Sequence, residues 1–510
     1  MNKVFAKLSD FTLKNKYLIL MFIIITIYFI IQYLFVFSWD FISYVLNAKY
    51  WFANGLYFEV FRPPLASFII GLFGFIFGYP LAEIMFIIFT NILFLIACTF
   101  LANELKFDKH IFYLLFFTYF VLFYGLINGT ELLSIAFLLF GIYYILKNKW
   151  ISGMFIGLSA LTRYTGIVFG VLLLFHKSIK NKIYALILFC LSFIPWFIYN
   201  KIEFGNFFQS IADQYFQNVV NRIGMEQAPK FLHFISPQSI FFIFTLGGLF
   251  FVIYRLIKYW NINSIFQKIN LILLIILVYT IYSYFSIPFK HPRYLFTIML
   301  PIAYFTYIGI NEVYVWAKSK RKNNNISLSN SRLIPWVIFL SVIITCILII
   351  FTIYTTNDNL KSRSEKGINV IYDQNLEECL MYSNNWIFYP YLDSNIVLLP
   401  IEIYSNKSEE YKNKVLFVEK KSISSEQFKE LNELLPIIFQ DESYVVFGSK
   451  DKCINIADYY VQFNNIFKQN IIVYTIDSRY TEPCNILFNK VNFIENTCKF
   501  INYDLFSKEK

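Results

Sequence analysis

The chain has 510 residues, of which 57% are hydrophobic and 21% aromatic, whereas 15% are charged. A soluble domain of this size does not carry so large an apolar fraction, so the composition excludes a soluble enzyme and indicates a membrane protein. The formal net charge of +11 comes largely from basic residues near the ends of apolar runs. It therefore reflects membrane topology and does not indicate a nucleic-acid partner.

Apolar runs recur from residue 17 to residue 354. At roughly 20 residues per span, they predict about eleven transmembrane helices. The first run, 17–37, is too long for the core of a signal peptide and precedes no small-residue cleavage site, so we expect it to remain as an anchor. The expected spans are 17–37, 65–79, 81–102, 110–127, 132–147, 151–175, 183–199, 239–257, 269–287, 294–313 and 334–354.

Basic residues at the span ends set the expected orientation. Lysines precede the first span, and further basic groups lie in 176–182 and 318–322. The positive-inside rule places these three segments in the cytoplasm. Because the number of spans is odd, the loop that carries Asp40 and the carboxyl-terminal part then lie outside. The sequence thus predicts a multi-pass protein of the cell membrane with a cytoplasmic amino terminus.

Two outward segments, 39–62 and 200–238, are too long for simple turns and are rich in aromatic residues. This composition is typical of helices that lie in the headgroup region of a membrane. Together the two segments could cover a cavity over the outer ends of the spans.

After residue 354, charged residues alternate with short runs of β-forming residues. The expected strands are 368–372, 396–399, 415–418 and 444–447, and the expected helix is 424–439, with a cap at Ser424. This order predicts a small α/β domain. We therefore divide the chain into a membrane domain, 1–354, and an extracytoplasmic α/β domain, 355–510. No glycine-rich phosphate loop follows a strand, so a nucleotide-binding domain is not expected.

The cysteines agree with an outward position of this domain. Four of them fall within it: Cys379, Cys453, Cys484 and Cys498. An even number in an oxidising compartment permits two disulfides, and three connectivities stay open. Neither these cysteines nor the four histidines of the chain have the spacing of metal ligands, so no metal site is assigned.

Four motifs follow one another within 17–315. They are Trp39-Asp40 with Arg62-Pro63-Pro64-Leu65, Leu161-Thr162-Arg163-Tyr164 within the glycine-containing span 151–175, Pro195-Trp196 with Asn200 and Phe204-Gly205-Asn206, and His291-Pro292-Arg293-Tyr294. In order and spacing they resemble GT-C glycosyltransferases related to protein O-mannosyltransferases and to the aminoarabinose transferase of lipid A. The resemblance implies an inverting transfer of a sugar from a polyprenyl-phosphate donor to a hydroxyl acceptor of a protein, lipid or glycan at the outer face.

The chemistry of such a transfer suits the residue types in these motifs. The acceptor hydroxyl needs a base, and a carboxylate at a partly desolvated interface can have a pKa high enough to serve. The departing lipid phosphate gains charge, which guanidinium groups stabilise through bidentate hydrogen bonds. We therefore expect Asp40 to be the base and Arg62 and Arg293 to bind the donor phosphate.

The chain also departs from the pattern of the family. Relatives often have paired carboxylates in the first loop, whereas here Phe41 follows Asp40, which argues against a bound metal. No cofactor is required, and a role for a divalent metal stays open. Where the family usually has an aspartate, this chain has Glu131, which we expect to support the site together with Arg163 and Tyr294.

Each of these residues has a plainer interpretation as well. Asp40 is suited to capping an interfacial helix, and Arg62 to reaching lipid headgroups. Arg163, within a span, needs a partner that could be purely structural. Arg293 at a helix start is equally suited to anchoring the helix at lipid phosphates.

Two further classes of function stay open. Charged residues within spans also mark substrate paths, so Glu83, Glu131 and Arg163 are compatible with a polytopic transporter or lipid flippase. Against this, no repeat relates the two halves of the chain, and transporters seldom devote so much of the chain to an outward terminal domain. A lipid-binding scaffold without catalysis would keep Arg62 and lose the base.

Overall fold

The computed structural model describes residues 16–36, 38–55, 57–218, 222, 227–238, 241–259, 264–320, 333–356, 360–393, 395–400, 411, 414–455 and 472–474. They form two compact units. The first contains the described residues of Met1–Tyr33 and Val60–Thr355, and the second contains those of Leu34–Glu59 and Thr356–Tyr474. We expected one boundary after residue 354, whereas Leu34–Glu59 of the first loop belongs to the same unit as the described residues of Thr356–Tyr474.

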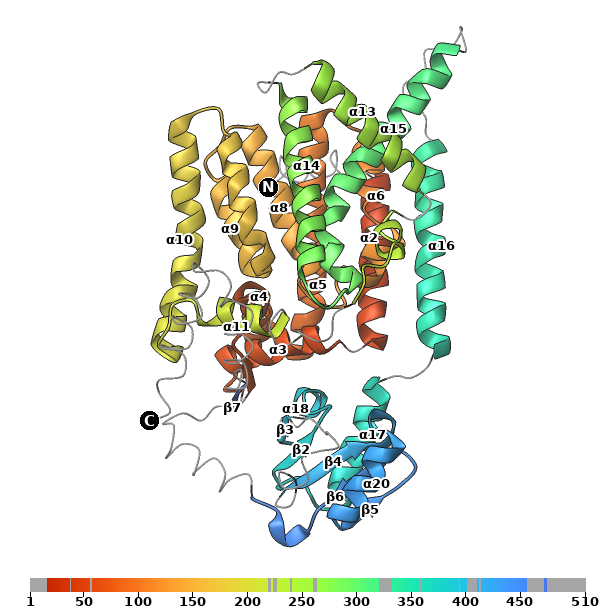
Figure 1. Cartoon of the computed structure of the whole chain (residues 1–510). Helices are drawn as coiled ribbons and strands as arrows, with labels where there is room; N and C mark the ends of the chain where they lie inside the picture. Colours follow the sequence, from red (N-terminus) through yellow and green to blue (C-terminus); the bar gives the residue numbers. More distant parts are fainter. Residues whose placement is uncertain are drawn as a thin grey trace, which may run out of the picture. The chain divides into compact units, whose positions relative to one another are not determined.

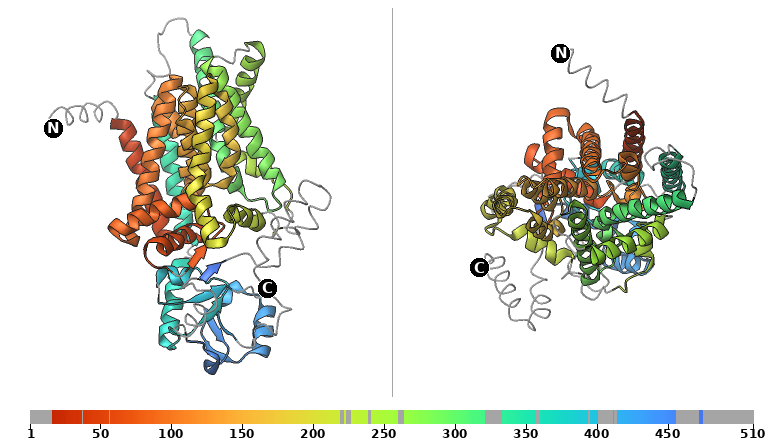
Figure 2. Two further views of the ribbon diagram at one scale, coloured as in Figure 1. Left: turned by 90° about the vertical axis from the view of Figure 1, so that its left-hand side faces the viewer. Right: turned by 90° about the horizontal axis from the view of Figure 1, so that it is seen from above.

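The first unit is a bundle of helices (Figure 1). They are α2 (Lys16–Phe35), α4 (Pro64–Phe77), α5 (Tyr79–Leu105), α6 (Lys109–Leu114), α7 (Tyr119–Tyr124), α8 (Glu131–Leu146), α9 (Ser152–Thr162), η1 (Tyr164–Phe175), α10 (Ile179–Phe204), α11 (Gln209–Asn218), α12 (Leu232–Ile235), α13 (Phe242–Lys258), α14 (Ile265–Ser286), η4 (Pro292–Ile298), α15 (Met299–Lys320) and α16 (Leu333–Thr356). The long helices run side by side, and α11 lies at one end of the bundle (Figures 1 and 2).

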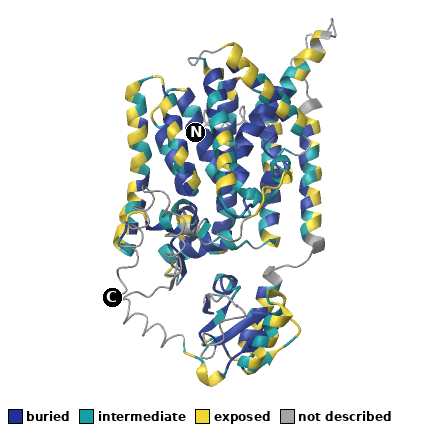
Figure 3. Ribbon diagram, viewed as in Figure 1, coloured by how far each residue is buried: buried dark blue, intermediate teal, exposed yellow. Residues whose placement is uncertain are grey.

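The lengths and composition of these helices are those of a helical membrane protein. Within the described residues, six helices are long and apolar enough to span a bilayer: Lys16–Phe35, Tyr79–Leu105, Ile179–Phe204, Ile265–Ser286, Pro292–Ala317 and Pro335–Ile353. The central helices are mostly buried, and exposed residues are frequent along the outer helices (Figure 3). Apolar side chains such as Val278 and Leu348 are among the exposed ones. Such a periphery suits contact with lipid. The count of eleven spans stays a prediction.

Residues 151–175, which we expected to form one span, form a hairpin instead. The extended backbone of Arg163 (φ −148°, ψ 115°) ends α9, and η1 runs back beside it. His176, which follows η1, has its Nε2 atom 2.7 Å from the Oγ atom of Ser152 at the start of α9. The reversal is tight, because a Cβ atom on Gly166 would lie 3.1 Å from the Cα atom of Ala160. The apolar run is thus two short antiparallel pieces.

The second unit contains a five-stranded sheet with the order β3-β2-β4-β6-β5. Its strands are β2 (Met381–Ser383), β3 (Leu398–Pro400), β4 (Val415–Glu419), β5 (Ile437–Gln440) and β6 (Tyr444–Phe447), and its helices include α17 (Leu360–Asp373), α18 (Phe388–Leu392) and α20 (Ser425–Leu434). Strands β3, β2 and β4 pair in parallel, and β4, β6 and β5 pair antiparallel. Three expected strands, at 396–399, 415–418 and 444–447, coincide with or overlap β3, β4 and β6.

Two local expectations in this unit have different outcomes. The cap at Ser424 is confirmed, since its hydroxyl accepts from the Gln427 amide at 3.2 Å and the Gln427 side chain accepts from the Ser424 amide at 2.8 Å. The helix is shorter than expected, because 437–440 form the edge strand β5. The expected strand at 368–372 is wrong, since these residues lie in α17. A short apolar run does not by itself distinguish a strand from a buried helical face.

The first loop packs into the α/β core of the second unit. Helix α3 (Trp39–Phe52) is followed by strand β1 (Tyr57–Glu59), which pairs in parallel with β7 (Ile472–Tyr474). The Lys49 ammonium donates to the Tyr391 carbonyl oxygen at 3.1 Å. The Trp39 ring lies edge-on against Trp386, with centroids 5.8 Å apart. Helix α3 is therefore held by residues far away in the sequence.

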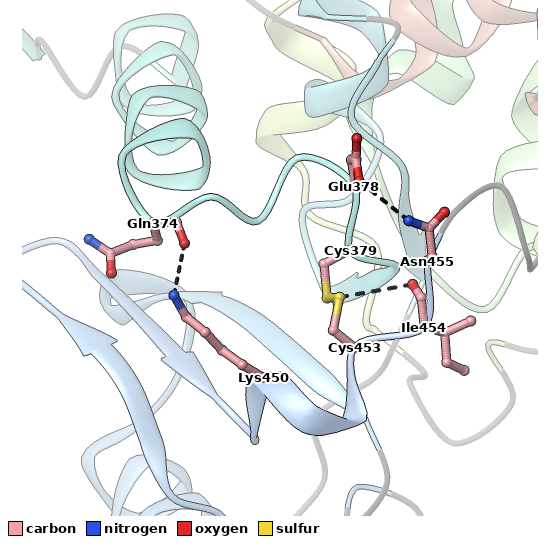
Figure 4. Close-up of a disulfide and its surroundings, with 7 residues drawn as sticks. All are labelled: Gln374, Glu378, Cys379, Lys450, Cys453, Ile454 and Asn455. Carbon is pink, nitrogen blue, oxygen red and sulfur yellow. Dashed lines mark hydrogen bonds between the residues drawn. A yellow bond between two sulfur atoms is a disulfide. The ribbon is translucent and has the colours of Figure 1, made fainter.

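A disulfide joins Cys379 and Cys453 beside β2 (Figure 4). The backbone on either side is paired as well, because the Leu380 amide donates to the Ile454 carbonyl oxygen at 2.9 Å. This bond is one of the two that we expected from four outward cysteines. Cys484 and Cys498 lie outside the described residues.

Candidate functional site

Asp40 lies half-buried in the first turn of α3, within the second unit. A carboxylate in this position is favoured by the helix dipole, as the plain capping interpretation also requires. The neighbouring Trp39 donates its indole N–H to the Oε1 atom of Glu59 at 3.4 Å, and Glu59 is 3% exposed. Sequence reasoning missed this second carboxyl group of the loop. The feature of the sequence that pointed to Glu59 was an acidic residue in an otherwise apolar and aromatic run shortly before Arg62.

Arg62 lies in the first unit, directly before Pro63 at the start of α4. Arg62 is half-buried, and its guanidinium carbon stands over the Phe61 ring, 4.9 Å from the centroid. Asp40 and Arg62, close in sequence, thus belong to different compact units.

The structure brings Glu131 and Arg163 together. Glu131 begins α8, and Arg163 stands at the break between α9 and η1, so the arginine Nη1 atom lies 2.5 Å from Oε1 of the glutamate. The glutamate side chain is 3% exposed and that of the arginine 17%. The second glutamate oxygen accepts from the Thr130 amide at 3.3 Å. A buried pair of this kind costs desolvation energy, which the close geometry and the extra hydrogen bond offset.

A second group of side chains surrounds Tyr294 in η4. Arg222 donates to the Tyr294 hydroxyl at 2.6 Å, and that hydroxyl donates to Asn218 of α11 at 3.4 Å. The guanidinium carbon of Arg293 stands 5.6 Å from the Tyr294 ring centroid. Two arginines therefore gather at one tyrosine, an arrangement that can bind an anion such as a phosphate group. Sequence reasoning missed Arg222, although a cation in an aromatic-rich loop was a usable signal.

The residues next to Arg293 hold η4 in place. The Arg293 amide donates to the Nδ1 atom of His291 at 3.2 Å. The Lys290 ammonium donates to the carbonyl oxygens of Tyr284 and Phe285 at 3.0 and 2.8 Å. Lysine at the carboxyl end of a helix satisfies its terminal carbonyl groups and complements its dipole. The charge of Lys290 thus ends α14 and fixes the start of η4.

The inner face of α11 is tied to α10 and η1 through Ser210, which is fully buried. Its hydroxyl lies 2.8 Å from the Trp196 indole nitrogen, 3.0 Å from the Tyr164 hydroxyl and 2.9 Å from the Asn200 amide nitrogen. Asn200, which belongs to the third of the four motifs, is thus a hydrogen-bonding residue of this network. Tyr164 follows Arg163 directly, so this network adjoins the Glu131–Arg163 pair along the chain.

Asp213 lies on the same helix between Ser210 and Asn218, and it is 3% exposed. Gln209 donates from its amide nitrogen to both carboxyl oxygens, at 3.0 and 3.1 Å. Burial raises the pKa of Asp213 to about 7, although the hydrogen bond from Gln209 acts in the opposite direction. In the part of the chain that the structure describes, no cation forms an ion pair with it. Sequence reasoning missed this acid, whose spacing from Ser210 places both on one helical face.

The residues of the first unit described above thus offer acids and cations in separate groups. Among the described residues, no three histidine, cysteine, aspartate or glutamate side chains lie close enough to hold a metal ion. The arginines near Tyr294 can stabilise negative charge, and Asp213, with a pKa raised by burial to about 7, can exchange a proton near neutral pH.

Residues 61–260 match the model of Glycosyltransferase family 87. A comparison with curated proteins gives no match. ArnT from Cupriavidus metallidurans, solved bound to undecaprenyl phosphate, superimposes with a TM-score of 0.56 and 12% identity over 86% of this chain and 99% of ArnT. For ArnT in the apo state the TM-score is 0.54, with 11% identity over 85% of this chain and 98% of ArnT. The archaeal oligosaccharyltransferase AglB from Archaeoglobus fulgidus was solved in complex with an inhibitory peptide and a dolichol-phosphate. For AglB the TM-score is 0.46, with 11% identity over 80% of this chain and 70% of AglB.

These similarities confirm the resemblance to GT-C membrane glycosyltransferases, and the chain has the fold of ArnT. The range that matches the glycosyltransferase model contains Arg62, the Glu131–Arg163 pair and Arg222. Asp40, Arg293 and Tyr294 lie outside it, so their roles rest on other arguments.

Proposed function

We propose, from the glycosyltransferase match over residues 61–260, that this protein transfers a sugar from a polyprenyl-phosphate donor to a hydroxyl acceptor at the outer face of the membrane. That match carries the proposal. The ArnT fold supports it, because ArnT was solved with undecaprenyl phosphate bound. The transfer inverts the anomeric carbon, since one displacement by the acceptor oxygen breaks the bond between the sugar and the phosphate.

The change of charge in this reaction explains the need for arginines. The donor is a phosphodiester with one negative charge, and the lipid product is a phosphomonoester that can carry two. Guanidinium groups stabilise this added charge more strongly in the transition state than in the substrate. Arg62 and Arg293 bind the phosphate in this proposal, and Arg222 joins them through its contact with Tyr294.

Asp40 is the proposed general base. Its carboxylate takes the proton of the acceptor hydroxyl as the acceptor oxygen attacks, a contribution of typically 10²–10⁴-fold for general bases. Glu131 and Arg163 have a supporting role, since their ion pair fixes the break between α9 and η1 beside the Tyr164 network. Tyr294 positions Arg222 through the hydrogen bond between them.

We also propose an orientation from the basic segments, with a cytoplasmic amino terminus and the α/β domain outside. Protease added to intact cells should then remove epitopes placed in the second unit, while an epitope in the basic segment 176–182 should stay protected. The reverse pattern would contradict the orientation and the outward reaction together.

The test of function is direct transfer. Purified protein in lipid nanodiscs is incubated with a panel of labelled polyprenyl-phosphate sugars and hydroxyl acceptors, and the release of polyprenyl phosphate is measured. We expect donor-dependent release from at least one sugar, abolished in the Asp40→Asn protein. Movement of labelled lipid across liposomes without any cleavage of the sugar–phosphate bond would contradict the proposal and favour a flippase.

A further inference from the structure

Three buried side chains where α11 meets α10 are hydrogen-bond acceptors that need further donors. Asp213 and Gln209 belong to α11 and Asn200 to α10, and they are 3%, 8% and 0% exposed. Helix α11 lies beside the carboxyl end of α10 (Figure 1). Within the described residues, neither Oε1 of Gln209 nor Oδ1 of Asn200 accepts a hydrogen bond. A buried polar atom without a partner costs free energy, so these oxygens indicate a donor outside the described residues.

Hydrogen bonds link the three side chains into one group. The Gln209 amide nitrogen lies 3.0 Å from Oδ1 and 3.1 Å from Oδ2 of Asp213. The Asn200 amide nitrogen lies 2.9 Å from the hydroxyl of Ser210, the residue after Gln209. Ser210 and Asp213 are three residues apart and therefore share one face of α11. Both amide nitrogens are thus engaged by the protein, and the acceptor oxygens are left for a ligand.

The Asp213 carboxylate has acceptor capacity that Gln209 does not fill. An ionised carboxylate offers about four acceptor positions, and one amide nitrogen can donate to two of them at most. In the part of the chain that the structure describes, the only hydrogen bonds to this carboxylate come from Gln209. Two adjacent hydroxyl groups of a sugar ring are donors that match the two oxygens of a carboxylate. The further acceptors on Gln209 and Asn200 suit a ligand with several hydroxyl groups.

Helix α11 also connects this group of acceptors to the arginines near Tyr294. Asn218, the last residue of α11, accepts from the Tyr294 hydroxyl at 3.4 Å, and Arg222 donates to the same hydroxyl at 2.6 Å. Asp213 precedes Asn218 by roughly 7.5 Å along the helix axis, since each residue adds about 1.5 Å. A sugar ring with its phosphate has dimensions of this order. One ligand can therefore reach the arginines with its phosphate and the acceptors with its sugar.

We propose that Asp213, Gln209 and Asn200 bind hydroxyl groups of the transferred sugar, and that the Asp213 carboxylate accepts from two adjacent hydroxyls. This inference rests on the proposed function, because it names the residues that hold the sugar of the polyprenyl-phosphate donor. Asp213 thereby selects among donors, since a sugar without the matching hydroxyl leaves a buried acceptor unpaired. Hydrogen bonds to a charged acceptor are also stronger than those between neutral groups.

The experiment compares lipids with and without a sugar. Equilibrium binding to the full chain in nanodiscs is measured for undecaprenyl phosphate and for its glucosyl, mannosyl and galactosyl derivatives. Asp213→Asn should weaken binding of at least one glycosylated lipid by roughly 10- to 150-fold, as expected for one hydrogen bond to a charged group. It should leave binding of undecaprenyl phosphate unchanged, whereas Arg222→Lys should weaken both. A deoxy derivative without the contacted hydroxyl should bind the parent and Asp213→Asn equally.

Glu203→Gln is the matched control, because it removes a carboxylate near the end of α10 outside this group, and it should bind every lipid as the parent does. Melting temperatures check folding, and Gln209→Ala provides the same comparison if Asp213→Asn does not fold. Equal losses for lipids with and without sugar, or no loss for any glycosylated lipid, would overturn the inference. Sugar transfer together with such a result would leave the proposed function intact, whereas a selective loss without any transfer would refute that function and keep the sugar site.

Discussion

The Tyr57 hydroxyl donates a hydrogen bond of 3.0 Å to the carbonyl oxygen of Leu398. This bond ties the first loop, which carries Asp40, to strand β3 of the α/β sheet within the second unit. The Tyr57 ring also packs on Trp386, with centroids 5.3 Å apart. The α/β domain therefore has a clear structural role, which is to hold the loop that contains the proposed base.

Removing this bond should loosen α3. Tyr57→Phe leaves the Leu398 carbonyl oxygen without its donor, so we expect the second unit to lose about 0.5–1.5 kcal/mol of stability. Tyr57→Ala also removes the buried ring and should cost about 3–5 kcal/mol. Thermal unfolding and transfer assays on both proteins measure the effects. Full stability in Tyr57→Ala would show that the loop does not depend on the sheet.

Asp40→Asn separates catalysis from helix capping. Asparagine caps helices about as well as aspartate but cannot accept the acceptor's proton. We expect turnover to fall by roughly 10²–10⁴-fold while binding of the donor lipid persists. Single-turnover transfer, equilibrium lipid binding and melting temperature are measured on one preparation. Near-parental turnover in the folded variant would remove Asp40 from the chemistry.

Arg62→Lys distinguishes a phosphate ligand from a headgroup anchor. Lysine keeps the charge and loses the planar fork, so donor affinity and turnover should both fall if Arg62 binds the phosphate in bidentate fashion. Arg222→Lys should have a similar effect, because lysine also lacks the planar guanidinium group that donates to the Tyr294 hydroxyl. The measurements are donor binding and transfer kinetics. Arg255→Lys, at the remote pair with Glu312, is the control, and unchanged kinetics in Arg62→Lys would assign Arg62 to anchoring.

The Glu131–Arg163 pair predicts strong coupling between two mutations. Glu131→Leu or Arg163→Leu alone leaves a buried charge and should cost about 3–5 kcal/mol, whereas the double mutant should cost less than either single change. A double-mutant cycle of unfolding in detergent measures this. If the double mutant is stable but inactive, the pair contributes to the site. Additive losses would contradict direct coupling.

The raised pKa of the buried Asp213 carboxyl group predicts that the stability of the protein depends on pH. This carboxyl group has a pKa of 3.8 in the unfolded chain and about 7 in the folded protein, so the folded state binds the proton more tightly. The resulting stability is present below pH 4 and is lost as the pH rises to 7, by an amount on the order of 4 kcal/mol. Asp213→Asn should flatten this part of the curve. Melting temperatures of both proteins across this range provide the test, and parallel curves would contradict the shift.

Local features of the structure could be predicted from the sequence because they depend on neighbouring residues. The apolar runs identified a helical membrane protein, and Ser424 and Gln427 defined a helix start by spacing alone. Strands at 415–418 and 444–447 followed from their β-forming residues. The same local reasoning failed at 368–372, where a short apolar run fits the buried face of a helix as well as a strand.

The contacts of the candidate site depend on where the chain reverses, which local patterns do not specify. Glu131 meets Arg163 across 32 positions, because the chain turns back at Arg163 within a continuous apolar run. Arg222 meets Tyr294 across 72 positions, and Tyr57 meets Leu398 across 341. The sequence alone supplied the residue types for phosphate and proton chemistry. Only the tertiary structure decided their partners, because packing of distant segments, and not local propensity, selects which buried polar groups satisfy one another.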